Sequence, residues 1–333
     1  MKVLVTGGNG FLGQALVREL LARGHAATSA SRRPSAELDR LGVRTRACDL
    51  RNCEQVEHAL EDQDAVLHAA ALTGIHGQRA DLWRTNVEGT AHVLAACRKN
   101  KIARLVYTSS PSVCFDGRDQ RQADESLPYA KRFLAPYPES KALAERAVLA
   151  ANAPELATCA LRPHLILGPG DPHLLPRLVE RARRGRLPIL GGARNEISFT
   201  WVENAAVAHV DALERLAPDA ACAGRAYFIA QEEPVSLWSW LADLFTRGGV
   251  PPPSGRVPLA LAYAGGAFAE LAWKLLRRAG EPPMTRFLAL QLGTSHSYDI
   301  RAAKRDLGYR ERVTTAEATE RLVADLRANY ASS

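Results

Sequence analysis

The first 165 residues of this chain alternate between short apolar runs and longer amphipathic segments. The runs that we interpret as strands are residues 2–7, 26–31, 43–49, 64–71, 104–110 and 157–163. Amphipathic segments with the apolar spacing of helices, such as 12–24 and 86–100, lie between them. Because tight turns cannot join parallel neighbours, this alternation predicts parallel strands with crossover helices. We therefore expect an α/β fold built on a doubly wound parallel sheet.

The alternation stops after Pro163. A loop rich in proline and glycine follows, and then an arginine-rich helix. Residues 225–230 have the composition of one more buried strand, so we expect the chain to return to the first sheet there. We predict a sheet domain over residues 1–165 with a return segment near 200–231, and a smaller, mainly helical region made of residues 166–199 and 232–333.

Composition is that of a soluble globular protein, with 47% hydrophobic and 24% charged residues. The formal charge of +7 comes mostly from arginines spread along the chain, without a nucleic-acid-binding motif. We therefore expect an anionic small ligand and no nucleic acid. The six cysteines lack metal-binding spacing, which predicts no metal site and a reducing compartment. Because an apparent strand begins at residue 2, we predict no signal peptide and a cytoplasmic protein.

Residues 257–273 are almost uncharged, with Glu270 as the only formal charge. The stretch is shorter than the ~20 residues that a membrane-spanning helix needs. We favour a helix of the core or a lid over the ligand. Peripheral contact with a membrane is the alternative.

Three glycines, Gly7, Gly10 and Gly13, lie where the first predicted strand passes into the first helix. A tight turn, close approach of the backbone to a pyrophosphate and close packing of helix on strand all favour glycine there. The helix N-terminus then offers N–H groups and a positive dipole end to the phosphates. The sequence TGGNGFLG, which includes Phe11 and Leu12, therefore predicts a Rossmann dinucleotide site.

The end of the second predicted strand indicates which dinucleotide is bound. Sites for NAD usually carry Asp or Glu there, to bind the ribose 2′-hydroxyl. Here Ser31 is followed by Arg32 and Arg33, and a guanidinium can hold a 2′-phosphate through two hydrogen bonds. Arg32 therefore predicts NADP(H) rather than NAD. The alternative is a pair of solvated loop arginines.

Further residues are expected to line the same site. Asp49 and Leu50, after the third strand, are candidates to flank the adenine. Ala69 and Ala70 are small residues where the fourth strand would pass beneath the cofactor. Pro163, at the end of the sixth strand, is assigned to the same site.

Tyr137 and Lys141 are four residues apart in the sequence YPESK. That spacing puts two side chains on one face of a helix. A nearby cation can stabilise a phenolate, whose parent phenol has an ordinary pKa of ~10. The spacing also occurs by chance, so by itself it permits a catalytic pair without establishing one.

Seven segments stand in the order and positions typical of the extended short-chain dehydrogenase/reductases: TGGNGFLG, CDL, HAAA, TNVEGT, VYTSS, YPESK and LRPHLILGPGD. The chain resembles this family over nearly its whole length, and within it the 3β-hydroxysteroid dehydrogenase/isomerase branch. That branch includes decarboxylating sterol-4-carboxylate 3-dehydrogenases and bacterial 2-alkyl-3-oxoalkanoate reductases of long-chain olefin biosynthesis. The block from LRPHLILGPGD to FTWVENAAVAHVDAL is most similar to the bacterial reductases.

The resemblance implies roles for three catalytic residues. Tyr137 would exchange a proton with the substrate oxygen. Lys141 would bind the nicotinamide ribose and lower the pKa of Tyr137. Ser110 would hydrogen-bond the substrate oxygen, with Ser109 and Ser112 as nearby competitors.

The resemblance also implies an NADP(H)-dependent oxidoreductase of lipid metabolism that reduces a 2-alkyl-3-oxoalkanoate to the 2-alkyl-3-hydroxyalkanoate. The smaller region would bind this hydrophobic substrate. The alternatives are a 3β-hydroxysteroid or sterol dehydrogenase that uses NAD(P), a nucleotide-sugar epimerase or reductase, and a cofactor-sensing regulator on the same fold. We also expect a homodimer. Whether the protein works within a multienzyme assembly is left open by the sequence.

On the substrate side the sequence is less specific. The arginines of residues 175–189 indicate either a solvated helix face or a site for a substrate carboxylate or coenzyme A phosphate. His164 and His173 are candidate substrate contacts, although lone histidines are more often structural.

Overall fold

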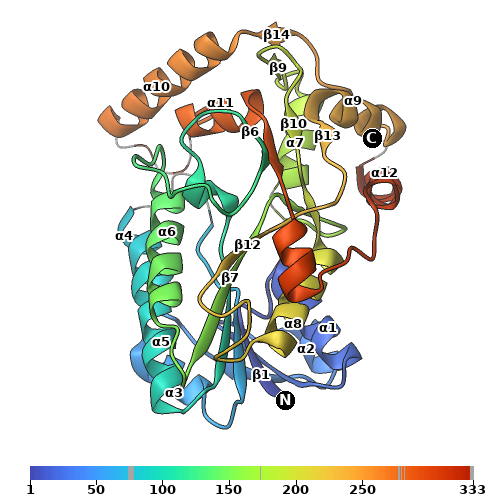
Figure 1. Ribbon diagram of the computed structural model, residues 1–333. Helices are drawn as coiled ribbons and strands as arrows, with labels where there is room; N and C mark the ends of the chain where they lie inside the picture. The colour runs from blue at the N-terminus through green and yellow to red at the C-terminus, as the bar shows by residue number, and fades with distance from the viewer. Residues whose placement is uncertain (74–78, 173, 277, 279, 281, 331–333) are drawn as a thin grey trace.

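A seven-stranded parallel sheet forms the centre of the computed structural model (Figure 1). The structure describes the chain except residues 74–78, 173, 277, 279, 281 and 331–333. In spatial order the strands are β12 (Ala226–Ile229), β7 (Ala157–Pro163), β5 (Arg104–Thr108), β4 (Ala65–His68), β1 (Lys2–Thr6), β2 (Ala26–Ser31) and β3 (Arg44–Ala47). The order reverses direction between β1 and β4, so the predicted doubly wound sheet is confirmed, and β12 returns beside β7 as expected.

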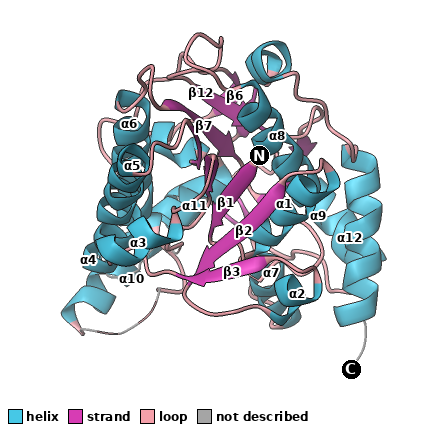
Figure 2. Ribbon diagram, turned by 90° about the horizontal axis from the view of Figure 1, so that it is seen from below, coloured by secondary structure: helices cyan, strands magenta, loops and turns pink. Residues whose placement is uncertain are grey.

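Helices cover both faces of the sheet (Figure 2). One layer consists of α1 (Phe11–Ala22), α2 (Ala36–Arg40) and α8 (Val202–Arg215), and the other of α3 (Cys53–Ala59), α5 (Gly89–Lys99) and α6 (Pro136–Ala150). Strands buried on both faces carry continuous apolar runs rather than alternation, as in Val3, Leu4 and Val5 of β1. Separate buried clusters fill the space between the sheet and each layer.

The segment expected as one helix over residues 86–100 has two parts. A π-helical turn spans Trp83–Glu88, directly after α4 (Arg79–Leu82), and α5 continues from Gly89. A Cβ on Gly89 would come within 2.8 Å of the Leu50 Cβ, so the glycine lets α5 lie close to the loop that follows β3. Turns of this kind often mark functional sites.

Outside the central sheet lie short strands that the sequence did not predict. A four-stranded sheet has the order β13 (Val235–Ser236), β10 (Glu196–Ile197), β15 (His296–Tyr298) and β6 (Gln120–Ala123). Two further ladders pair β11 (Thr200–Trp201) with β8 (Ile166–Leu167), and β14 (Arg256–Val257) with β9 (Ile189–Leu190). Strands of two to four residues are too short for alternating hydrophobicity to reveal them.

Helices of the smaller region are α7 (Leu174–Arg183), α9 (Leu237–Arg247), α10 (Leu259–Leu275), α11 (Arg286–Gly293) and α12 (Thr315–Tyr330). A second core, which includes Phe199, Trp201 and Trp238, packs between several of them and the small sheet. The apolar residues 257–273 mostly form α10, which lies at the outer edge of the molecule (Figure 1). Only Ala262 and Gly266 of this helix are buried, so it is not a core helix. No helix in the described residues is long and apolar enough to cross a membrane.

Candidate functional site

A cavity of about 900 Å³ lies at the carboxyl ends of the central parallel strands. Ligands of doubly wound sheets bind at this edge, where the strand order reverses. The cavity brings together the predicted catalytic and cofactor-binding residues: Gly7, Gly10, Phe11, Leu12, Gly13, Arg32, Asp49, Leu50, Ala69, Ala70, Ser110, Tyr137, Lys141 and Pro163. Segments more than 150 residues apart therefore contribute to one site.

The glycine loop connects β1 to α1 and forms one wall of this cavity. Gly7 has a φ of +72°, a conformation that side chains disfavour. A Cβ on Gly13 would stand 2.0 Å from the carbonyl oxygen of Gly7, so only glycine lets the first turn of α1 pack against the loop. With Gly10 as its N-cap, α1 has unpaired N–H groups at its start, which could hold phosphate oxygens.

Arginines line the cavity beside the ends of β2 and β3. Arg32 and Arg33 follow Ser31 and are exposed. Arg51, for which the sequence predicted no role, also lines the cavity and binds both carboxylate oxygens of Asp49, at 3.0 and 2.6 Å. Hydrogen bonds from Arg51 lower the pKa of Asp49, so this carboxylate stays charged and paired. Because Asp49 offsets only one of the three arginines, Arg32, Arg33 and Arg51 form a cationic edge of the cavity that could hold a phosphate.

Tyr137 and Lys141 both belong to α6, so the predicted shared helix face is confirmed. The helix begins at Pro136, which suits a first helical position because its missing N–H would have no helical partner. Tyr137 is half-buried and Lys141 is buried, and both line the cavity.

Burial decides the protonation of this pair. It lowers the pKa of Lys141 to about 7 and raises the pKa of Tyr137 to about 12. The Lys141 Nζ donates a hydrogen bond to the Thr108 carbonyl oxygen at 2.6 Å and lies 4.2 Å from the centre of the Tyr107 ring. The family resemblance implied that Lys141 lowers the pKa of Tyr137. In this structure burial raises the pKa of Tyr137, and the role that the resemblance implies for Lys141 stays a prediction.

Ser110 follows β5 and points its hydroxyl toward a second serine. The Ser110 Oγ lies 2.9 Å from the Ser112 Oγ and accepts a hydrogen bond from the Ser112 N–H. Pro111 begins a short 3-10 turn, so Ser110 caps that turn. Ser109 lines the same cavity, and its buried Oγ has no partner among the described residues.

Asn86, in the π-helical turn, connects the loop after β4 to α6 through hydrogen bonds. The sequence predicted no role for it. Its side-chain oxygen accepts from the Leu72 N–H at 2.7 Å, and its amide nitrogen donates to the Leu72 carbonyl and to Ser140 Oγ, both at 3.0 Å. Ser140 Oγ in turn donates to the Tyr137 carbonyl at 2.8 Å. The only sequence signal was the segment TNVEGT.

A buried ion pair fixes α6 on the sheet. Glu145, four residues after Lys141, accepts two hydrogen bonds from Arg162 of β7, at 2.6 and 3.0 Å. The Tyr129 hydroxyl donates to the same carboxylate at 2.7 Å. These contacts set the rotation of α6 and hence the direction of Tyr137 and Lys141.

The other substrate-side candidates lie elsewhere. Arg183, Arg184 and Arg186 are exposed, and none of the five arginines of residues 175–189 is among the described residues that line the cavity. His164 is buried, and its Nδ1 lies 2.5 Å from the Ser198 carbonyl oxygen, which is a structural contact. His173 lies outside the described residues. The described residues contain no cluster that could hold a metal ion.

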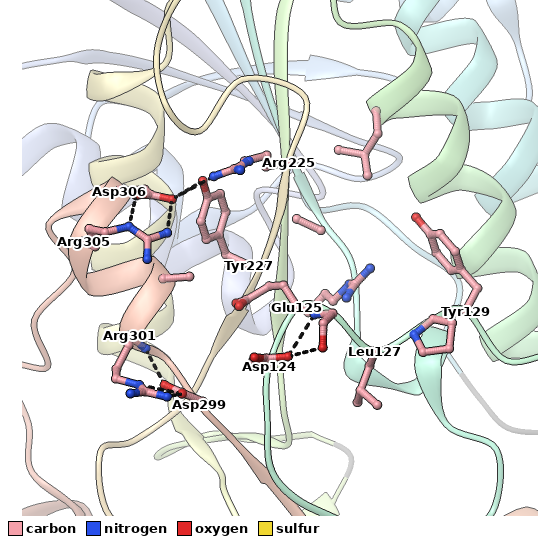
Figure 3. Close-up of a pocket in the computed structure, with 16 residues that line it drawn as sticks. Asp124, Glu125, Leu127, Tyr129, Arg225, Tyr227, Asp299, Arg301, Arg305 and Asp306 are labelled. Carbon is pink, nitrogen blue, oxygen red and sulfur yellow. Dashed lines mark hydrogen bonds and ion pairs between the residues drawn. The ribbon is translucent and has the colours of Figure 1, made fainter.

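A second cavity, of about 710 Å³, lies beside the edge strand β12 (Figure 3). Its charged side chains mostly neutralise one another: Arg301 pairs with Asp299, and Asp306 pairs with both Arg305 and Arg225. Glu125 accepts the Phe228 N–H, which covers part of the exposed strand edge. These contacts are structural, and the catalytic candidates line the other cavity.

Comparisons with known proteins place the chain in a family. The model of the 3-beta hydroxysteroid dehydrogenase/isomerase family matches residues 4–260. A 2-alkyl-3-oxoalkanoate reductase of Stenotrophomonas maltophilia (strain K279a) is 48% identical, with 97% of this chain and 99% of the relative covered. The decarboxylating sterol-4-alpha-carboxylate 3-dehydrogenase of Mus musculus is 36% identical, with 97% and 90% covered.

Among solved structures, MoeE5 in complex with UDP-glucose and NAD has a TM-score of 0.73 at 27% identity, with 98% of this chain and 99% of that chain covered. The resemblance noted from the sequence motifs is therefore confirmed. This chain is an oxidoreductase of the short-chain dehydrogenase/reductase type and belongs to the 3-beta hydroxysteroid dehydrogenase/isomerase family.

Proposed function

We propose that this protein uses NADPH to reduce the 3-keto group of a 2-alkyl-3-oxoalkanoate, giving the 2-alkyl-3-hydroxyalkanoate. The observation that carries the proposal is the single cavity that holds the glycine loop, the cationic edge and the Tyr137, Lys141 and Ser110 side chains. The relative from Stenotrophomonas maltophilia bears the name of this activity.

The residues present fit a nicotinamide dinucleotide. Gly7, Gly10 and Gly13 carry no side chains where a pyrophosphate would approach, and a Cβ on Gly7 would meet the Ala70 Cα at 2.9 Å. MoeE5, a structural relative, binds NAD. Preference for NADPH rests on Arg32, Arg33 and Arg51 at the adenosine end, where a 2′-phosphate would need cations.

Three side chains would act on the substrate oxygen and its proton: Tyr137 transfers the proton, and Ser110 and Lys141 assist. When bound, the reduced nicotinamide supplies a hydride to the carbonyl carbon. The Tyr137 hydroxyl, protonated at neutral pH because its pKa is about 12, donates its proton to the carbonyl oxygen as the C=O bond becomes a C–O bond. Ser110 donates a hydrogen bond to the same oxygen, and Lys141, held by Thr108, stabilises the phenolate until solvent returns the proton.

The substrate end of the cavity suits an alkyl chain. Leu72, Leu165, Ile166 and Leu174 line it together with Tyr137. Apolar walls with few polar groups favour a hydrophobic substrate whose orientation is fixed by its keto group. Ile166 and Leu174 belong to the smaller region, to which we assign the substrate side.

The test measures oxidation of NADPH and NADH by purified protein with a long-chain 2-alkyl-3-oxo acid. We expect turnover with NADPH, and a loss of about 10²–10⁴-fold in kcat for Tyr137→Phe, because proton transfer is removed while the ring remains. Tyr129→Phe, whose hydroxyl lies on the buried ion pair, serves as the matched control. Turnover of a 3β-hydroxysteroid with NAD, without reduction of any 3-oxo acid, would reject both the substrate and the cofactor.

A further inference from the structure

The outer face of α10 exposes large apolar side chains that no other part of the described chain covers. The exposed fractions are 64% for Leu261, 74% for Phe268, 54% for Leu271, 73% for Leu275 and 62% for Leu276. Five of the eight large exposed hydrophobic residues of the described chain thus gather on this helix and its C-cap. Contiguous apolar patches of this kind on a protein surface usually mark an interaction site.

Helical spacing aligns these residues into one stripe. Leu261, Phe268 and Leu275 are seven residues apart, and Leu271 lies three residues after Phe268. Small residues, Ala264 and Gly265, occupy the exposed positions between Leu261 and Phe268. The opposite face is not free, because Gly266 packs against the backbone of Thr285 at the start of α11.

The charges around the stripe are complementary to an anionic surface. Glu270, the only acid of α10, turns away from the stripe and accepts two hydrogen bonds from Arg286, at 2.8 and 2.7 Å. Exposed cations lie at both ends: Arg256 before the helix, and Lys274 and Arg278 at its end. The Arg278 guanidinium lies 5.1 Å from the Trp273 ring, and tryptophan beside cations is typical of residues at a membrane interface.

The shape of the helix also suits a lipid surface better than a protein partner. A stable protein interface uses about 20–30 residues on each side. Here a single helix projects at the outer edge of the molecule (Figure 1). With 17 residues it is about 26 Å long, and it can lie in the plane of a bilayer interface with its stripe buried.

We propose that α10 docks the protein onto the surface of an anionic phospholipid bilayer, with the stripe in the acyl boundary and Arg256, Lys274 and Arg278 at the headgroups. Burial of the Phe and Leu side chains and attraction of the cations to anionic headgroups both favour binding. The docking needs neither substrate nor cofactor, so it stands or falls separately from the proposed reaction.

The experiment sediments the purified full chain with sucrose-loaded vesicles, without substrate or cofactor. We expect binding to vesicles of equal parts phosphatidylglycerol and phosphatidylcholine, weaker binding to phosphatidylcholine alone, and further weakening by high salt. The double substitution Phe268→Glu with Leu271→Glu should lower the partition coefficient at least about tenfold. Leu41→Glu, at an exposed leucine of another surface, is the matched control and should bind as the wild type does.

Circular dichroism should show that the double variant is folded, since both altered side chains are exposed. Three results would overturn the proposal. The first is that the wild type does not sediment with the anionic vesicles, and the second is that the double variant binds them as well as the wild type does. The third is that the wild type is a dimer and the double variant is a monomer. The last result would assign the stripe to a second copy of the chain.

Discussion

At the scale of single residues, burial controls the chemistry of the site. Lys141 is removed from solvent and keeps one strong contact, to the Thr108 carbonyl, so its charged form is costly. Tyr137 keeps its proton for the same reason.

Lys141→Met tests that cost through the pH dependence of stability. Burial places the pKa of Lys141 at about 7, below its ordinary value of 10.5. Between these values folding releases a proton, so the lysine penalty is full below pH ~7 and fades as pH rises toward ~10.5. The melting temperature of the variant minus that of the wild type should therefore fall by a few degrees from pH ~6 to ~10.

Loss of the hydrogen bond to Thr108 shifts the melting temperature of the variant by the same amount at every pH. The change of the melting-temperature difference with pH is therefore the readout. Lys304→Met, at a surface lysine paired with Glu232, serves as the control and should give a flat difference. A flat difference for Lys141→Met as well would show that the lysine does not lose its proton on burial.

Arg51 gives a second test at the residue scale. Removing the Arg51 side chain takes one cation from the cationic edge. It also leaves the Asp49 carboxylate unpaired, so that this carboxylate would repel a 2′-phosphate. We expect Arg51→Ala to raise the KM for NADPH about tenfold or more with little change for NADH, because a charge-assisted bond contributes about 1.5–3 kcal/mol. Adding Asp49→Asn should restore part of the loss. Arg40→Ala, at an exposed arginine paired with Glu37, is the control, and an equal change in both cofactors would refute the role.

At the scale of elements, the site depends on how α6 is attached to its neighbours. Glu145 and Arg162 fix the helix on β7, and Asn86 connects it to the loop after β4. The YPESK spacing predicted the shared helix face because that relation is local. The attachment was not predictable, because no periodic pattern marks its partners. In sequence Asn86 lies 54 residues from Ser140 and 14 from Leu72, and Glu145 lies 17 from Arg162.

Asn86→Ala is the test of this attachment. The substitution leaves the Leu72 N–H and carbonyl without their partner and frees Ser140, which we expect to cost about 1–3 kcal/mol of stability and about tenfold in kcat. Asn100→Ala is the matched control, because the Asn100 side chain likewise donates two hydrogen bonds, here both to backbone carbonyls, but at the far end of α5. It should lower stability and leave kcat unchanged. Equal kinetic effects would remove Asn86 from the positioning network.

At the scale of the whole molecule, an ion-pair cluster joins the C-terminal segment to the sheet domain. Glu19 of α1 is nearly buried and accepts from Arg23 at 2.6 Å and from both terminal nitrogens of Arg312 at 2.7 Å. Arg23 also binds Asp211 of α8 at 2.7 Å. These contacts connect α1, α8 and the segment before α12.

We expect Glu19→Ala to lower the free energy of unfolding by about 1–3 kcal/mol, because Arg23 keeps Asp211 while Arg312 loses its partner. Urea denaturation measures the loss. Glu317→Ala, which breaks an exposed ion pair with Arg321, should change stability by less than about 0.5 kcal/mol. A similar loss in both variants would show that the Glu19 cluster does not join the two parts.

The sequence by itself determined the central sheet, the glycine loop and the shared face of Tyr137 and Lys141, because apolar period and residue spacing are local properties of the chain. Only the tertiary structure decided the pairing of Arg51 with Asp49, the contacts of Asn86 and the small sheet. It also decided that the apolar residues of α10 face outward, since a hydrophobic helix can be buried or exposed with the same pattern. Those features depend on which distant segments meet, and on how much solvent each side chain keeps.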